Sequence, residues 1–178
     1  MQPALYRVER IGSGFVAIMA RPRANEWAAE DFSALANAGI RRIVSLLEVH
    51  EEYVLGLEKE AEHCADANIA FNSFPIPDRG VPSSPHALFE LSKETYHRCA
   101  GGESTAIHCR AGIGRSSLVA AAVLMHCGFD VDEAFAQIQK VRGLEVPDTL
   151  EQAQWLRDNS DIVLTGGRAE ARAGIDHD

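Results

Sequence analysis

The sequence lacks a long apolar segment. Its longest uninterrupted apolar run covers residues 118–125, far short of the roughly 18 residues that a membrane-spanning helix needs. The first residues also lack the apolar region of a secretory signal peptide. A run of this length is typical of a core helix, and we expect the protein to be cytoplasmic.

Patterns for metal binding and for disulfides are absent as well. The cysteines, at positions 64, 99, 109 and 127, form no Cys-x-x-Cys pair and no cluster with histidine at zinc spacing. We therefore expect neither a structural metal nor a disulfide framework. Cys64, Cys99 and Cys127 are expected to pack as small apolar side chains. The sequence leaves open whether one of them resolves an oxidised Cys109.

Positive charge is scarce. The chain has 17 Lys and Arg against 26 Asp and Glu, which gives a formal net charge of −9 at pH 7. Nucleic acids and anionic membranes are bound by basic faces, so neither is expected as a general partner. An anionic substrate must therefore be attracted locally. Four arginines lie in or beside the segments that carry the candidate site residues and could attract it: Arg79, Arg110, Arg115 and Arg142.

Length and periodicity indicate one α/β domain. We expect a single domain over residues 1–160 and a flexible tail over 161–178, where the segment from Gly166 onward has no apolar face. Short apolar runs predict strands over 14–20, 40–47, 69–74 and 104–108. Helical spacing and caps predict helices over 25–39, 51–67, 84–101, 115–126, 130–143 and 148–159. This alternation predicts three layers, with a mostly parallel central sheet and helices on both faces.

The segment 108–117, His-Cys-Arg-Ala-Gly-Ile-Gly-Arg-Ser-Ser, has the features of an anion-binding loop. Gly112 and Gly114 allow positive φ, so successive backbone N–H groups can converge on one point. The helix that follows directs its N-terminal donors and partial positive charge to the same point. The residues expected to hold a phosphate group are Arg110, Ala111, Gly112, Ile113, Gly114 and Arg115.

Cys109 is the expected nucleophile in this loop. The helix terminus, Arg115 and His108 should lower its pKa from about 8.5 into the range of roughly 3.5–7.5 that reactive cysteines have. The thiolate could then attack a phosphorus held by the loop amides and by the Arg115 guanidinium, forming a cysteinyl phosphate. Ser116 is placed to hydrogen-bond the departing sulfur, while His108 is expected to hold the loop and tune the thiol.

The pattern His108-Cys109-(five residues)-Arg115-Ser116 resembles the signature of the cysteine-dependent protein tyrosine phosphatase superfamily. The short chain is similar to its small dual-specificity branch, and within that branch to the cyclin-dependent-kinase-associated phosphatase type, over most of residues 10–158. The resemblance implies a phosphoric monoester hydrolase that acts on phosphotyrosine in proteins, with phosphoserine and phosphothreonine as further candidates. It implies no metal and no cofactor.

The resemblance also implies a general acid and a residue that orients water. Pro75-Ile76-x-Asp78-x-x-x-Pro82 resembles the general-acid loop of the branch, in which Asp78 would protonate the leaving oxygen. A turn aspartate beside Gly80 is the alternative interpretation. Gln152 lies in a stretch similar to the one that carries the family's water-orienting glutamine. Gln154 competes for that role, and an ordinary helix-surface position for Gln152 stays open.

Two other functions stay open at this stage. Phosphoinositide phosphatases of the superfamily use lysines in this loop; none is present, but Arg110 could partly replace them, so a phosphoinositide or another small phosphate ester is an alternative substrate. The chain could also be a phosphoprotein-binding module without turnover, although the presence of Cys109, Arg115 and Asp78 argues against that reading. The sequence does not determine the oligomeric state.

Overall fold

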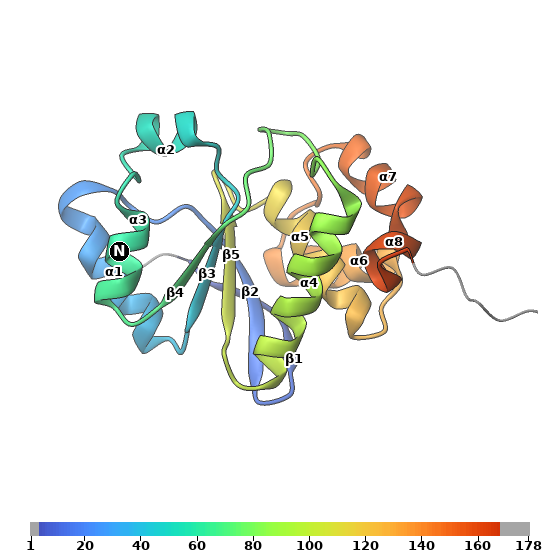
Figure 1. Ribbon diagram of the computed structural model, residues 1–178, viewed down its shortest axis with the longest axis horizontal. Helices are drawn as coiled ribbons and strands as arrows, with labels where there is room; N and C mark the ends of the chain where they lie inside the picture. The colour runs from blue at the N-terminus through green and yellow to red at the C-terminus, as the bar shows by residue number, and fades with distance from the viewer. Residues whose placement is uncertain (1–3, 168–178) are drawn as a thin grey trace, which may run out of the picture.

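The computed structural model describes residues 4–167 and contains one five-stranded sheet in the order β1-β2-β5-β3-β4 (Figure 1). The strands are β1 Tyr6–Ile11, β2 Gly14–Ala20, β3 Arg42–Ser45, β4 Ala70–Ser73 and β5 Thr105–Cys109. β1 pairs with β2 in the antiparallel direction, and every other neighbouring pair is parallel. The predicted mostly parallel sheet is therefore confirmed, with one antiparallel edge strand.

Helices cover both faces of the sheet, so the predicted three-layer α/β architecture is also confirmed (Figure 1). The helical elements are η1 Asn25–Trp27, α1 Ala28–Asn37, α2 Val49–Leu55, α3 Glu60–Asp66, α4 Pro85–Ala100, α5 Arg115–His126, α6 Val131–Arg142, α7 Leu150–Asp158 and α8 Ser160–Thr165. One face packs against α1 and α3, and the other against α4, α5 and α6. Within residues 4–167, none of the helices combines the length and the apolar character that spanning a bilayer requires.

Three elements differ from the sequence-based expectation. β1 was not predicted, because Glu9 and Arg10 separate its two buried side chains, Val8 and Ile11. The helix predicted over residues 51–67 is two helices, since Gly56 ends α2 in the left-handed conformation with φ 69°. Helix α8 begins at Ser160, the last residue of the predicted domain, extends into the segment 161–178 predicted as a tail, and packs its buried Val163 into the core. Residues 168–178 of that predicted tail lie outside the described residues.

The central strand and the central helix position the candidate site. β5 lies between β2 and β3, and it ends at Cys109. Helix α5 starts at Arg115, and every residue from Arg115 to Met125 is buried. The loop of residues 110–114 therefore joins a buried strand to a buried helix at the carboxyl edge of the parallel strands, where open α/β sheets bind ligands.

Candidate active site

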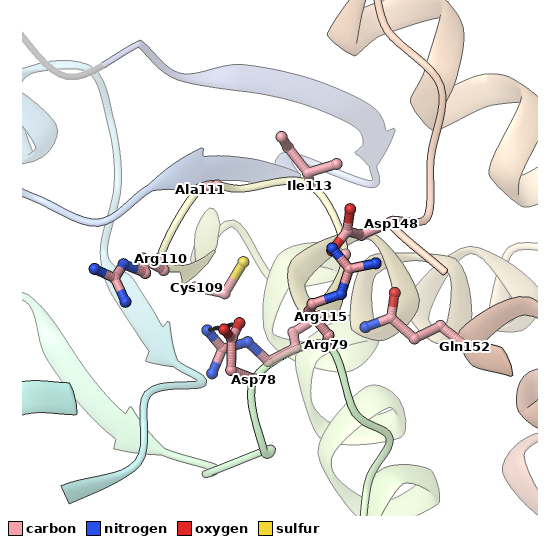
Figure 2. Close-up of a pocket in the computed structure, with 10 residues that line it drawn as sticks. Asp78, Arg79, Cys109, Arg110, Ala111, Ile113, Arg115, Asp148 and Gln152 are labelled. Atoms are coloured by element: carbon pink, nitrogen blue, oxygen red, sulfur yellow. Dashed lines mark hydrogen bonds and ion pairs between the residues drawn. The ribbon is translucent and has the colours of Figure 1, made fainter. Parts of the chain in front are cut away.

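Side chains from three separate segments converge on a pocket of about 230 Å³ around Cys109 (Figure 2). The pocket is lined by Asp78, Arg79, Cys109, Arg110, Ala111, Ile113, Gly114, Arg115, Asp148 and Gln152. The fold thus brings together Cys109, Arg115, Asp78 and Gln152, which the sequence suggested separately. The described part of the chain has no cluster of three or more His, Cys, Asp or Glu side chains that could hold a metal ion.

Two glycines shape the loop for different reasons. Gly112 has φ 68°, and a Cβ there would lie 2.5 Å from the backbone C and O atoms of Met19, so both the conformation and the space require glycine. Gly114 has φ −86°, which any residue can adopt, so the expectation of positive φ was wrong at this position. Its requirement is steric, since a Cβ would lie 2.8 Å from Cβ of Asp148 and 2.9 Å from Oε1 of Gln152.

Cys109 is buried at the base of the pocket, with 3% of its surface exposed. Its Sγ lies 3.5 Å from Oγ of Ser116, close enough for the hydroxyl to donate a hydrogen bond to a thiolate. Burial alone would raise the pKa of the thiol. Hydrogen bonds from Ser116 and the Ile113 backbone, together with the charge of Arg115, outweigh burial and lower this pKa below its ordinary value. The direction agrees with the expectation for a reactive cysteine.

The Arg115 guanidinium is buried and held on several sides. Glu51 of α2 binds it in a bidentate manner, with Nη1–Oε2 at 2.7 Å and Nη2–Oε1 at 2.9 Å. Nη1 also donates to the Ile76 carbonyl at 2.9 Å, and Nη2 lies 3.2 Å from Oδ1 of Asp78. Burial would lower the pKa of Arg115, but the Glu51 hydrogen bond and the nearby negative charges raise it. The guanidinium is therefore a fixed cation beside Cys109.

Sequence reasoning missed Glu51, which lies 64 positions before Arg115. The local structure explains only part of its position. Glu51 is the third residue of a capping box, and its Oε2 accepts a hydrogen bond from the backbone N–H of Glu48 at 3.0 Å. Burial would raise the pKa of Glu51. The Arg115 hydrogen bond, the Glu48 backbone bond and the charge of Arg115 outweigh burial and lower that pKa.

We expect Glu51→Gln to lower the free energy of unfolding by about 1.5–3 kcal/mol at neutral pH, the usual range for a hydrogen bond to a charged group. Because the folded-state pKa of Glu51 is lowered, its stabilisation is present above the ordinary glutamate pKa and is lost as the pH falls through the lowered value. The difference from wild type should therefore shrink in acid. Urea unfolding at several pH values measures it, with the exposed Glu58→Gln as the matched control. Equal stability of Glu51→Gln and wild type at pH 7 would contradict the assignment.

Asp78 lies on the loop between β4 and α4, and its side chain is 56% exposed at the mouth of the pocket. The loop is tied down on both sides of this residue. The Arg115 guanidinium binds the carbonyl of Ile76, and Nε2 of Gln152 donates to the carbonyl of Gly80 at 3.0 Å. The carboxylate of Asp78 is thereby held near Cys109 from a remote loop (Figure 2).

Gln152 is fully buried and lines the pocket, which rules out the alternative of an ordinary surface position. Its Oε1 accepts from the backbone N–H of Thr149 at 3.2 Å, while Thr149 Oγ1 accepts from the backbone N–H of Gln152 at 3.2 Å. This reciprocal cap starts α7 after Thr149, so Asp148 lies before the helix that it was predicted to open. Gln154 is exposed and donates to Asp158 at 2.7 Å, away from the pocket lining.

The remaining arginines have different positions. Arg79 and Arg110 line the pocket, and Arg79 pairs with Asp148 at 3.4 Å. Arg142 lies outside the pocket lining and donates to the carbonyls of Gly112 at 3.1 Å and Ala111 at 3.3 Å. Arg142 therefore braces the loop of residues 110–114, whereas the sequence suggested it as a charge that attracts substrate.

His108 does not line the pocket. Its ring is fully buried behind the loop, with Nε2 at 2.7 Å from Oε1 of Glu60, the first residue of α3. The position agrees with the expectation that His108 supports the loop. Glu60 was missed, because nothing distinguishes it from the other acidic residues of the helix predicted over 51–67.

Comparisons with known proteins converge on one family. The family model "Swiss Army Knife protein, DSP-PTPase phosphatase domain" matches residues 6–172. The cyclin-dependent kinase inhibitor 3 proteins of Rattus norvegicus and Sus scrofa are each 28% identical over 122 residues, which cover 67% of this chain and 50% of theirs. The chain thus spans about half the length of these curated relatives.

Solved structures show the same fold. The crystal structure of Tk-PTP in the active form matches with TM-score 0.74 at 26% identity, covering 90% of this chain and 99% of that chain. The structure of kinase-associated phosphatase, with its catalytic-site cysteine replaced by serine, matches with TM-score 0.79 at 22% identity. That match covers 92% of this chain and 96% of the phosphatase chain.

Proposed function

Because the chain belongs to the DSP-PTPase phosphatase domain family of the Swiss Army Knife proteins, we propose that it is a protein phosphatase working through a cysteinyl-phosphate intermediate. Its proposed substrate is phosphotyrosine in proteins, with phosphoserine and phosphothreonine as further substrates. The observation that carries the proposal is the meeting of Cys109, Arg115 and Asp78 at one pocket.

In the first step, the Cys109 thiolate attacks phosphorus in line with the ester oxygen. An S–P bond forms and the P–O bond to the substrate breaks. The loop amides and Arg115 hold the phosphoryl oxygens, whose charge they stabilise in the transition state. Asp78, protonated, gives its proton to the departing oxygen, since an alkoxide or phenoxide is a poor leaving group. The products are the free alcohol or phenol and phosphorylated Cys109.

In the second step, water attacks the phosphocysteine. The Asp78 carboxylate takes a proton from the water, the S–P bond breaks, and inorganic phosphate leaves. The Ser116 hydroxyl, 3.5 Å from the sulfur, stabilises the thiolate as it departs. Gln152 is the proposed orienting residue for water, supported by its place in the pocket lining. Its Nε2 already bonds the carbonyl of Gly80, so Gln152 also holds the Asp78 loop over Cys109.

Apart from water, the scheme uses only side chains and backbone amides of the chain itself, and the proposal includes neither a metal nor a cofactor. Action in the cytoplasm is part of the same proposal. It is supported by the four cysteines, all of which are free thiols in the described structure, as expected in a reducing compartment.

Substrate class is tested by phosphate release from phosphotyrosyl and phosphothreonyl peptides and from a phosphoinositide panel, each in EDTA. We expect turnover of the phosphotyrosyl peptide that survives the chelator. Turnover confined to the phosphoinositides would replace the protein substrate with a lipid one. Tight binding of phosphopeptides without release of phosphate from any substrate would instead make the chain a binding module.

A further inference from the structure

A buried acidic side chain contacts the histidine that precedes the nucleophile. Glu60 lies 48 positions before His108 in the chain, and both side chains are almost fully buried, with exposed fractions of 2% and 0%. Oε1 of Glu60 is 2.7 Å from Nε2 of His108. Neither residue lines the pocket, so neither is placed to touch a substrate.

The surroundings of the ring favour its doubly protonated form. Nε2 faces the Glu60 carboxylate, and Nδ1 lies 3.4 Å from the carbonyl oxygen of Cys109. Both partners are acceptors, whereas a neutral imidazole carries only one N–H. Burial disfavours the cation, but the charge and hydrogen bond of Glu60, with contributions from Cys109, raise the pKa of His108.

The carboxylate depends on the ring in return. Among residues 4–167, Oε2 of Glu60 is buried without a hydrogen-bond partner, so His108 supplies the cation that compensates this charge. Two other titratable groups face the pair. Cys64 is a neutral thiol, because burial and Glu60 raise its pKa to about 12. The pKa of Glu52 on α2 is raised by burial and by Glu60, although His108 acts in the opposite direction.

We propose that Glu60 is a positioning residue: it keeps His108, the residue before Cys109, as an imidazolium, and this cation stabilises the thiolate. The inference rests on the proposed role of Cys109 as the nucleophile. It adds a chain of three groups, Glu60, His108 and Cys109, that runs from the interior to the base of the pocket. Ser116 and Arg115 act on the same sulfur.

The pH dependence of Cys109 alkylation by iodoacetamide tests the proposed role of Glu60 without any substrate. The other thiols do not interfere, because burial raises the pKa of Cys127 to about 11, that of Cys64 to about 12, and that of Cys99. We expect Glu60→Gln to raise the pH midpoint by about 1, so that alkylation below the midpoint is about tenfold slower. The matched control is Glu62→Gln, an exposed residue of the same helix. Equal midpoints in the two variants would overturn the proposal.

A second measurement needs no variant. In nitrogen-15 spectra of histidine-labelled wild-type protein at pH 7, both ring nitrogens of His108 should be protonated. A neutral ring would overturn the proposal. This test remains valid even if Glu60→Gln fails to fold. The two proposals fail separately. If wild type releases no phosphate but the midpoint moves as expected, the phosphatase function falls and the role of Glu60 stands. If phosphate is released but Glu60→Gln leaves the pH midpoint unchanged, the phosphatase function stands and the role of Glu60 is wrong.

Discussion

Cys109→Ser is expected to abolish phosphate release, with a loss of more than about 10⁴-fold, the scale seen when the nucleophile of a covalent mechanism is removed. A serine hydroxyl in the same place stays protonated at neutral pH. The hydrogen bonds and the Arg115 charge that lower the pKa of the thiol therefore cannot produce a comparable nucleophile. The measurement is phosphate release from a phosphotyrosyl peptide at high enzyme concentration.

Three further observations support the assignment, and the first two separate lost chemistry from lost structure. Cys109→Ser should bind the phosphopeptide about as tightly as wild type, because the loop amides and Arg115 are unchanged. Cys127→Ser, which alters a half-buried thiol away from the pocket, should retain wild-type turnover. Acid-quenched wild type should carry one phosphoryl group on Cys109. Substantial turnover by Cys109→Ser would remove the cysteinyl phosphate from the mechanism.

Asp78→Asn is expected to lower kcat by about 10²–10⁴-fold, the usual contribution of a positioned general acid or base. The asparagine keeps the size of the side chain but cannot give up a proton to the leaving oxygen. The loss should therefore depend on the leaving group. It should be largest for phosphoseryl and phosphotyrosyl peptides, and much smaller for an aryl phosphate whose phenol is strongly acidic, since that phenoxide departs without a proton.

The pocket offers a matched control for this prediction. Asp148 also lines the pocket, and its carboxylate pairs with Arg79 at 3.4 Å. We expect Asp148→Asn to have a much smaller effect, with no dependence on the leaving group. If Asp148→Asn instead shows the large, leaving-group-dependent loss and Asp78→Asn does not, the general acid is Asp148 and the role given to Asp78 is wrong.

Local sequence patterns predicted the elements whose structure depends mainly on neighbouring residues. The alternation of short apolar runs with helical spacing predicted the confirmed α/β layers. It failed at β1, where two consecutive charged residues separate Val8 from Ile11 and no regular alternation exists; pairing with β2 forms that strand. It also failed at Gly56, where one glycine in the left-handed conformation separates two helices that share a continuous pattern.

The proposed chemistry of the loop follows from consecutive residues of the sequence. Cys109, Gly112, Arg115 and Ser116 lie within eight consecutive positions, so their spacing already implied a strand end, an anion-binding turn and a helix start. The structure places Cys109 and Arg115 in one pocket as that spacing suggested. Asp78 was identified as the candidate general acid only because its proline-rich loop resembles that of a known family.

The residues that hold these groups in place come from distant parts of the chain. Glu51 reaches Arg115 across 64 positions, Glu60 reaches His108 across 48, and Gln152 reaches Gly80 across 72. A buried charge needs a partner, but no periodicity or local spacing in the chain says which of many acidic residues supplies it. The partner is selected only when folding brings Glu51 of α2, Glu60 of α3 and Gln152 of α7 within hydrogen-bond distance of these groups.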